Sequence, residues 1–281
     1  MKRSYFEGWY YKQRGVDGTV ALIVARHRDI SAVESASLQI ITEEGSQSAF
    51  FPASEFEMDG PRVRLGNSAF SQRGLSIDVR KDELSVEGTL SFGPIAGPVG
   101  DIMGPFRFAP GLECRHAVAS MRHTVDGVLM IGGRRYAFEG GVGYIEGDRG
   151  TSFPKRYVWT HADWEGNSLM LSVADVPFHG FSFVGCVGFL YLNGKETRIA
   201  SYRGARVITA TAHAVEIRQG KMTLLVEAQQ KRVHRLLAPT KGGMTRTIYE
   251  SASCPVRYRC TVGEKALFDF VCPHASFEGN W

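Results

Sequence analysis

The chain has 281 residues, 43% of them hydrophobic, and a formal net charge of +4 at pH 7. This composition excludes an intrinsically disordered chain, and the small charge gives no reason to expect a nucleic-acid partner. No apolar run reaches the ~20 residues of a membrane-spanning helix, and the N-terminal residues lack the apolar stretch of a signal peptide. We therefore expect a cytoplasmic protein with no stable membrane insertion.

Aromatic rings crowd the start of the chain, at Tyr5, Phe6, Trp9, Tyr10 and Tyr11. Alternation along an extended strand divides these rings between two faces. Some of these rings would fill the interior of a barrel as part of its first strand. We predict that Trp9 and Tyr11 share the face that lines a ligand cavity. Glu7 falls on the same face, where a carboxylate among aromatic rings is expected to pair with a lysine or an arginine.

Short alternating segments, separated by turn residues, continue along the chain. An antiparallel meander is predicted for residues 75–79, 84–88 and 90–92. Glycine-containing pairs, which accept the positive φ of tight turns, predict hairpins at residues 132–133, 193–194 and 219–220. Only residues 29–34 and 117–124 have a pattern that suits a helix, and both segments are short. The sequence therefore predicts an all-β protein.

Chain breakers in the segment Gly150–Pro154 interrupt the strand pattern near the middle of the sequence. We place a domain boundary there, between an N-terminal β-barrel-like module, residues 1–150, and a C-terminal lipocalin-like β-barrel module, residues 151–281. The expected fold is thus two lipocalin-like barrel or sandwich modules of antiparallel strands. A loop rich in proline and glycine, residues 93–110, would either cover a cavity mouth or form a plain surface excursion.

Acids, bases and rings are concentrated around this boundary. On an extended strand Tyr144, Glu146 and Asp148 share one face. Two carboxyls this close disfavour joint ionisation, so one of them would stay protonated and act as a general acid, although the arginine that follows favours the ionised form. Beyond the break, alternation places four more side chains on one polar and aromatic face: Lys155, Tyr157, Trp159 and His161.

These segments resemble the tocopherol cyclase family, and in particular its bacterial branch. The motifs that carry the resemblance are Phe6–Lys12 (FEGWYYK), Met103–Phe106 followed by Glu113–His116, Ser152–Trp159 (SFPKRYVW), and Leu237–Pro239 followed by Gly243–Arg246. The wider group includes carotenoid hydratases and lipocalin-like cyclases, and it implies two β-barrel-like domains with a ligand site between or inside them. Plant-type members carry Glu-Lys-Asn-Trp where this chain has Glu-Gly-Asp-Arg at residues 146–149, so the substrate is left open.

The resemblance implies a cofactor-independent reaction on a hydrophobic, prenylated small molecule. An alkene is protonated and a phenolic oxygen closes a ring on the resulting cation. Glu146 or Asp148 would be the acid, and His161 or His116 the partner of the hydroxyl. The substrate would be bound by rings and one carboxylate, from Trp9, Tyr11, Glu113, Tyr144, Tyr157 and Trp159.

Two other functions fit the same residues. If water captured the cation, the enzyme would be a hydratase. If the barrel only carried an isoprenoid or acyl ligand, the carboxylates near residue 146 would be structural ion-pair partners. In either case an exposed aromatic rim would allow peripheral contact with a membrane.

The remaining reactive residues predict neither a metal nor a cofactor. The five cysteines are scattered without paired motifs, which favours reduced thiols. Cys114 with His116, and Cys272 with His274, would share a strand face, but neither spacing is that of a structural zinc site. A basic cluster is either a solvated strand end or a site for an anionic head group, and it comprises Lys231, Arg232, His234, Arg235, Lys241 and Arg246. We assign His179 and His213 to the surface or to packing.

Overall fold

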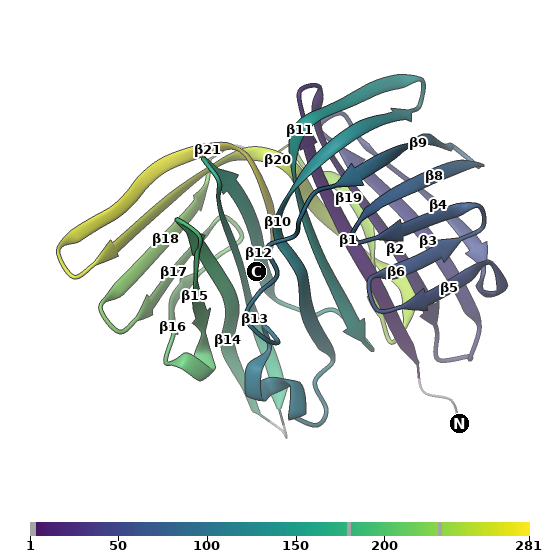
Figure 1. The fold of residues 1–281 in the computed structure, drawn as a ribbon. Helices are drawn as coiled ribbons and strands as arrows, with labels where there is room; N and C mark the ends of the chain where they lie inside the picture. Colours follow the sequence, from purple (N-terminus) through teal and green to yellow (C-terminus); the bar gives the residue numbers. More distant parts are fainter. Residues whose placement is uncertain (1–3, 179–180, 230–231) are drawn as a thin grey trace. The chain divides into compact units, whose positions relative to one another are not determined.

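The computed structural model describes residues 4–178, 181–229 and 232–281 (Figure 1). These residues form antiparallel strands and three short 3₁₀ turns, and the described part of the chain contains no α-helix. It accordingly has no helix that is long and apolar enough to cross a membrane. The all-β prediction is confirmed. His179 and Lys231 lie outside the described residues.

The first sheet has the strand order β4-β3-β2-β1-β11-β10-β9-β8-β7-β6-β5. Its strands are β1 Tyr5–Gly15, β2 Gly18–Arg28, β3 Glu34–Thr42, β4 Ser46–Pro52, β5 Phe56–Asp59, β6 Arg62–Leu65, β7 Ser68–Ser71, β8 Gly74–Lys81, β9 Leu84–Phe92, β10 Cys114–Ile131 and β11 Arg134–Gly150. The 3₁₀ turns η1 and η2 span Ala53–Glu55 and Gly104–Phe108.

The second sheet has the order β15-β14-β13-β12-β21-β20-β18-β17-β16, and β19 also pairs with β20. Its strands are β12 Tyr157–Trp164, β13 Asn167–Phe178, β14 Phe181–Leu192, β15 Lys195–Ala200, β16 Arg206–Ala210, β17 Ala214–Gln219, β18 Met222–Ala228, β19 His234–Thr240, β20 Gly243–Val262 and β21 Lys265–Asn280. The third 3₁₀ turn, η3, spans Ser201–Arg203.

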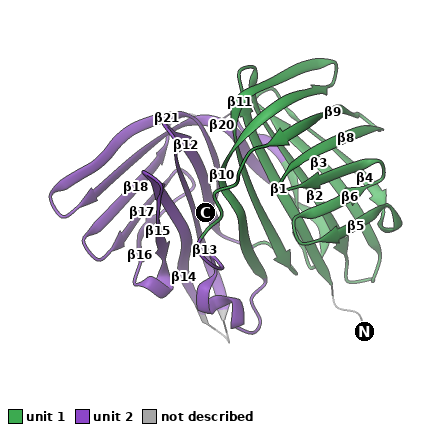
Figure 2. Cartoon of the chain, viewed as in Figure 1, with its two compact units in different colours: residues 1–98, 114–153, 236–247 green, residues 99–113, 154–235, 248–281 purple. Residues whose placement is uncertain are grey.

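The chain forms two compact units (Figure 2). Unit 1 consists of Met1–Pro98, Cys114–Phe153 and Leu236–Thr247. Unit 2 consists of Val99–Glu113, Pro154–Arg235 and Ile248–Trp281. The chain leaves unit 1 between Phe153 and Pro154, inside the segment where the sequence places a boundary. A single division at residue 150 would assign residues 99–113 to the first module and residues 236–247 to the second. In the structure, residues 99–113 belong to unit 2 and residues 236–247 to unit 1.

Local chemistry explains the turns that join the strands. Gly132 and Gly133 have φ of 57° and 83°, and Asn193 and Gly194 have φ of 51° and 76°, as the hairpin prediction requires. Residues 117–124 lie within β10 rather than in a helix. Here pairing with β11, which a local pattern does not reveal, decides the structure.

The side chains of strand β1 project from both faces of the first sheet. It lies between β2 and β11, with Tyr11 paired to Leu22 on one side and Ile145 on the other. All three residues belong to the hydrophobic core of unit 1. Odd-numbered side chains of β1 therefore face this core, and even-numbered ones face the opposite surface, which we call the even face.

Candidate functional site

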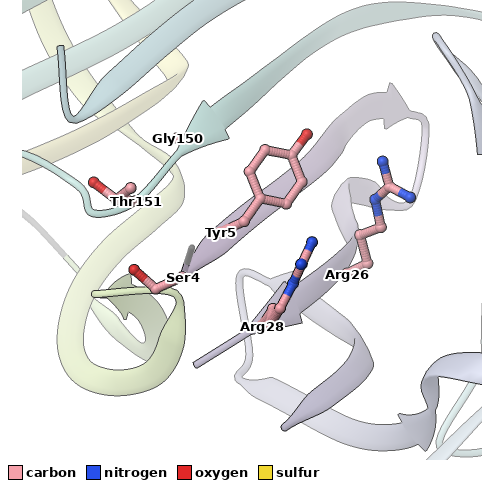
Figure 3. A pocket seen from close by; sticks show the side chains of 6 residues that line it. All are labelled: Ser4, Tyr5, Arg26, Arg28, Gly150 and Thr151. Carbon is pink, nitrogen blue, oxygen red and sulfur yellow. The ribbon is translucent and has the colours of Figure 1, made fainter. Parts of the chain in front are cut away.

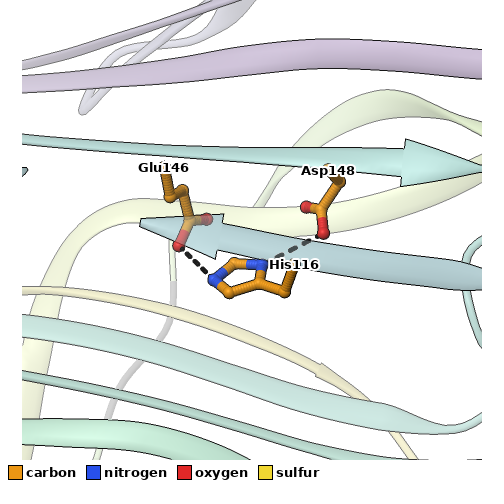
Figure 4. Close-up of side chains that lie close together, drawn as sticks. All are labelled: His116, Glu146 and Asp148. Carbon is orange, nitrogen blue, oxygen red and sulfur yellow. Dashed lines mark hydrogen bonds and ion pairs between the residues drawn. The ribbon is translucent and has the colours of Figure 1, made fainter. Parts of the chain in front are cut away.

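Three titratable side chains meet on the even face of unit 1 (Figure 4). His116 of β10 is the direct cross-strand partner of Asp148 of β11, and Glu146 lies two residues before Asp148 on the same face. The ring atom Nδ1 of His116 is 3.0 Å from Asp148 Oδ1, and Nε2 is 3.1 Å from Glu146 Oε2. The imidazole thus bridges two carboxylates, and the alternation predicted for Glu146 and Asp148 is confirmed.

Two further donors extend this chain of contacts. The Tyr144 hydroxyl donates a hydrogen bond of 2.6 Å to Glu146 Oε2, and the Cys114 thiol donates one of 3.4 Å to Asp148 Oδ1. Tyr144 is fully buried, and this burial, followed by the charge of Glu146, raises its pKa well above 10.0. Tyr144 therefore remains a proton donor to Glu146 at neutral pH.

His116 is held as a cation between the two acids. Burial lowers its pKa, but the charges of Glu146 and Asp148, together with their hydrogen bonds, outweigh burial and bring the pKa well above 6.5. Both ring nitrogens are then N–H donors. The like-charge repulsion expected between the two carboxyls is consequently offset by the imidazolium that lies between them.

The two ends of this cluster differ in access. The side chains of His116 and Glu146 are 9% and 7% exposed, whereas that of Asp148 is 25% exposed. Both contacts of Asp148 use Oδ1, and its Oδ2 accepts no hydrogen bond from any described residue. Asp148 is therefore the end of the cluster that a ligand can reach.

The same three residues also offer the kinds of atom that bind a metal ion. One ligand atom from each of His116, Glu146 and Asp148 lies within 4.8 Å of the others. Each ring nitrogen of His116, however, lies within 3.1 Å of a carboxylate oxygen, so a metal ion would have to displace one of these contacts. This donor set suits proton transfer better than metal binding.

Strand β1 contributes two even-face residues that sequence reasoning missed. Tyr10 is paired with Glu146 and Lys12 with Tyr144, and the side chains are 8% and 1% exposed. The register therefore places a buried lysine opposite Tyr144, on the face that carries the two carboxylates. Strand alternation predicts that Tyr10 and Lys12 lie on the opposite face of β1 from Trp9 and Tyr11. Only the register with β11 shows which of these faces carries Glu146 and Asp148.

Trp9 and Tyr11, predicted to bind substrate, lie on the opposite face of β1 from this cluster. Tyr11 is fully buried on the core side of β1, and its hydroxyl donates to Pro61 O at 2.8 Å. Trp9 is partly buried and packs against the same core. Glu113 precedes β10 and belongs to unit 2.

The remaining predicted residues lie on β12, in unit 2. Tyr157, Trp159 and His161 share one face of this strand, as alternation requires, and all three are buried. His161 Nε2 is 3.2 Å from Ser168 Oγ, and the Tyr157 hydroxyl donates to Glu278 Oε1. Glu278, a buried carboxylate near the C-terminus, was not predicted as a site residue because no motif marks it.

Solved structures of other proteins have a similar fold, and the similarity extends over nearly the whole chain. An AttH protein from Nitrosomonas europaea is 11% identical, with a TM-score of 0.57, and the match covers 99% of this chain and 93% of that one. CghA, crystallised with Sch210972, is 11% identical, with a TM-score of 0.63 and coverage of 98% and 88%. A second CghA structure gives 10% identity and a TM-score of 0.62.

Sequence comparison adds no closer relative. No family model matches the chain, and no curated protein matches it. At 10–11% identity the structural neighbours establish a shared all-β fold, and the activity has to be argued from the site.

Proposed function

We propose that this protein is a cofactor-independent cyclase that protonates an alkene of a hydrophobic, prenylated phenol. The observation that carries this proposal is the chain Glu146–His116–Asp148, in which a buried imidazolium contacts a partly exposed carboxyl whose Oδ2 accepts no hydrogen bond from a described residue. The CghA structure with Sch210972 shows that a protein of this fold binds a small organic molecule.

The reacting form carries one proton more than the ion pair of His116 with two carboxylates, and this proton resides on Asp148 Oδ2. This proton moves to the less substituted alkene carbon, and the π electrons form the new C–H bond, which leaves a tertiary cation. The phenolic oxygen then bonds to the cation, and its proton returns to Asp148 Oδ2. No proton is consumed and the product has the mass of the substrate.

The other residues stabilise the carboxylate that exists between these two steps. His116 Nδ1–H and the Cys114 thiol both donate to Asp148 Oδ1, so they favour loss of the proton from Oδ2. Glu146 keeps His116 charged and is itself held by Tyr144. Asp148 is the catalytic residue, and His116 and Glu146 are positioning residues.

A turnover assay tests this proposal. The protein is incubated with geranylgeranyl hydroquinone, and the products are separated by chromatography and weighed by mass spectrometry. We expect a product of equal mass, and we expect Asp148→Asn to lower the rate at least about a hundredfold. Glu57→Gln, a change at an exposed carboxylate of β5, serves as the matched control. Full turnover by D148N would rule out Asp148 as the acid.

A carrier function is the second candidate, and one observation favours it. Glu146 is buried and contacts both His116 and Tyr144, as expected of a structural ion pair. If the hydroquinone binds but returns unchanged, the carrier function is supported. A product heavier by one water would instead indicate a hydratase.

A further inference from the structure

An open pocket of about 440 Å³ lies where β1 begins and β2 and β11 end (Figure 3). It is lined by Ser4, Tyr5, Arg26, Arg28, Gly150 and Thr151. Its two arginines already contact carboxylates, since Arg26 lies 2.9 Å from Glu7 and Arg28 lies 3.3 Å from Glu34. Polar side chains in the interior of unit 1 differ, because several of their atoms have no hydrogen-bond partner among the described residues.

Three adjacent strands bring two of these interior side chains together. Gln13 of β1 is paired with Gly143 of β11, and Gly143 is paired with His123 of β10. Directly paired residues project from the same face, and Gln13 shares the core face of β1 with Tyr11. Gln13 is 0% exposed and His123 is 1% exposed. An amide and an imidazole are thus enclosed together inside unit 1.

The glycine between them allows the two side chains to converge. A Cβ on Gly143 would lie 2.1 Å from His123 Nε2 and 2.2 Å from Gln13 Oε1. Both atoms therefore occupy the space above the glycine, and a larger residue there would force them apart. The polar ends of Gln13 and His123 meet over a residue that has no side chain.

Three buried atoms at this meeting point make no hydrogen bond with any described residue. They are Gln13 Nε2, Gln13 Oε1 and His123 Nε2. Leaving buried polar atoms without a partner is destabilising, and small molecules enclosed in protein interiors commonly satisfy such atoms. The convergence of all three atoms on one place favours a single shared partner.

The surroundings restrict the charge and the size of this partner. Burial, and to a lesser extent the charge of Arg122, lowers the pKa of His123 to about 4, so the ring is neutral at neutral pH. Ring atom Nδ1 of His123 lies 2.9 Å from Ser120 Oγ, and the ring packs against Phe92 with 4.5 Å between centroids. Neither Gln13 nor Ser120 carries a charge. The site therefore suits a small, neutral group.

We propose that Gln13 and His123 together bind one hydroxyl group, supplied by an internal water molecule or by the alcohol of an organic ligand. A hydroxyl group donates and accepts, so it suits either tautomer of His123. If Ser120 donates to Nδ1, the hydroxyl accepts from Nε2–H and donates to Gln13 Oε1. If Nδ1 carries the proton, the hydroxyl donates to His123 Nε2 and accepts from the Gln13 amide.

This site is separate from the candidate acid. Gln13 and Gly143 face the core of unit 1, whereas Glu146 and Asp148 lie on the even face. The proposal therefore does not depend on the proposed cyclase activity, and neither of the measurements that follow involves turnover of the hydroquinone.

A high-resolution crystal structure of the full chain, purified from a lipid-containing extract, tests the proposal directly. We expect electron density for an oxygen within about 2.7–3.2 Å of both Gln13 and His123. An isolated peak would assign the hydroxyl to water, and density that continues into an organic molecule would assign it to an alcohol. A direct hydrogen bond between the two side chains, or no density between them, would overturn the proposal.

Thermal unfolding tests the same site in solution. Gln13→Met replaces the amide by an apolar chain of similar length. If the amide had no partner, this change would raise the melting temperature. With a bound hydroxyl, Q13M leaves that group and His123 short of a partner, so we expect the melting temperature to fall by about 2–6 °C. Gln229→Met, at an exposed amide, should leave it unchanged.

A double variant shows whether the two side chains share the hydroxyl. His123→Phe should also lower the melting temperature, and His213→Phe, at an exposed imidazole, is its control. Q13M combined with H123F removes both sides of the site, so we expect a smaller loss than the two single losses together. A melting temperature raised by Q13M, or strictly additive losses, would contradict a shared ligand.

Discussion

At the scale of single residues, the protonation of His116 makes the stability of the protein depend on pH. Its folded pKa is raised above the 6.5 of an unfolded histidine by Glu146 and Asp148, against the effect of burial. The stabilisation from this pairing is therefore complete below pH 6.5 and is lost as the pH rises through the folded pKa. His116 thus stabilises unit 1 in acid and neutral solution more than in alkaline solution.

The variant His116→Gln tests this dependence. It leaves two carboxylates without their cation, so we expect a loss of about 3 kcal/mol in unfolding free energy at pH 6. The gap between wild type and variant should narrow toward alkaline pH, as measured by urea denaturation across the range. The control is His213→Gln, at an exposed imidazole. A gap that stayed constant or grew with pH would contradict the assigned charge.

For His27 we expect the opposite dependence of stability on pH. It is 5% exposed, and burial lowers its pKa to about 4. Between pH 6.5 and about 4 the unfolded state binds more protons, so stability falls as the pH falls, by at most about 1.4 kcal/mol per pH unit. Urea denaturation of His27→Gln should show a shallower loss over this interval than the wild type. An unchanged slope would mean that His27 is not neutral in the folded protein.

The structure brings some of the predicted site residues together and places others on the opposite face of the sheet. The sharing of one face by Tyr144, Glu146 and Asp148 follows from strand alternation, which is local. The position of His116 between the acids depends on the register of β10 against β11. That register sets Cys114 against Gly150, a pairing that no local rule supplies.

At the scale of elements, one glycine sets how closely β1 and β11 approach. A Cβ on Gly147 would lie 2.8 Å from Gly8 O and 2.8 Å from Trp9 Cε3. Trp9, which the sequence assigned to a ligand cavity, covers this bare stretch of the neighbouring strand. The ring is therefore explained by packing inside unit 1.

Gly147→Ala should consequently strain this pair of strands. Trp9 or the β1 backbone would have to move, so we expect a loss of about 1–3 kcal/mol in unfolding free energy, measured by urea denaturation. Gly45→Ala is the matched control, since a Cβ there meets no atom within 4 Å. If both variants were equally stable, the result would contradict the close contact between Trp9 and Gly147.

The elements themselves were largely predictable, because hairpin turns and alternation are encoded locally. The pairs at Gly132 and Asn193 mark turns as predicted. The helical pattern of residues 117–124 was misleading, because bulges in β10 shift its register and disturb the alternation. Their cause is the pairing with β11, which a local window does not contain.

At the scale of the whole molecule, the two units do not follow the predicted halves of the chain. Residues 236–247 belong to unit 1, although 82 residues of unit 2, Pro154–Arg235, precede them. The Gln39 side chain makes two hydrogen bonds with this segment. Its Nε2 donates to Leu237 O at 2.9 Å, and its Oε1 accepts from Leu237 N at 2.8 Å. Composition cannot reveal such a return of the chain.

A fragment of residues 1–150 is therefore expected to fold poorly. It lacks the partner of the buried Gln39 amide, and an unsatisfied buried polar group costs about 1–3 kcal/mol. Circular dichroism should show no cooperative thermal transition. A second fragment, in which residues 1–153 are linked to 236–247, should recover one. Cooperative unfolding of residues 1–150 near the melting temperature of the full chain would instead support the boundary predicted from the sequence.

The interleaving of the units also bears on heredity. The chain passes from one unit to the other five times, and strand β20 begins in unit 1 and ends in unit 2. A single crossover between two genes exchanges everything on one side of a point. No such point in this gene separates a complete unit from the rest, so recombination cannot transfer either unit whole, and the pair is expected to be inherited together.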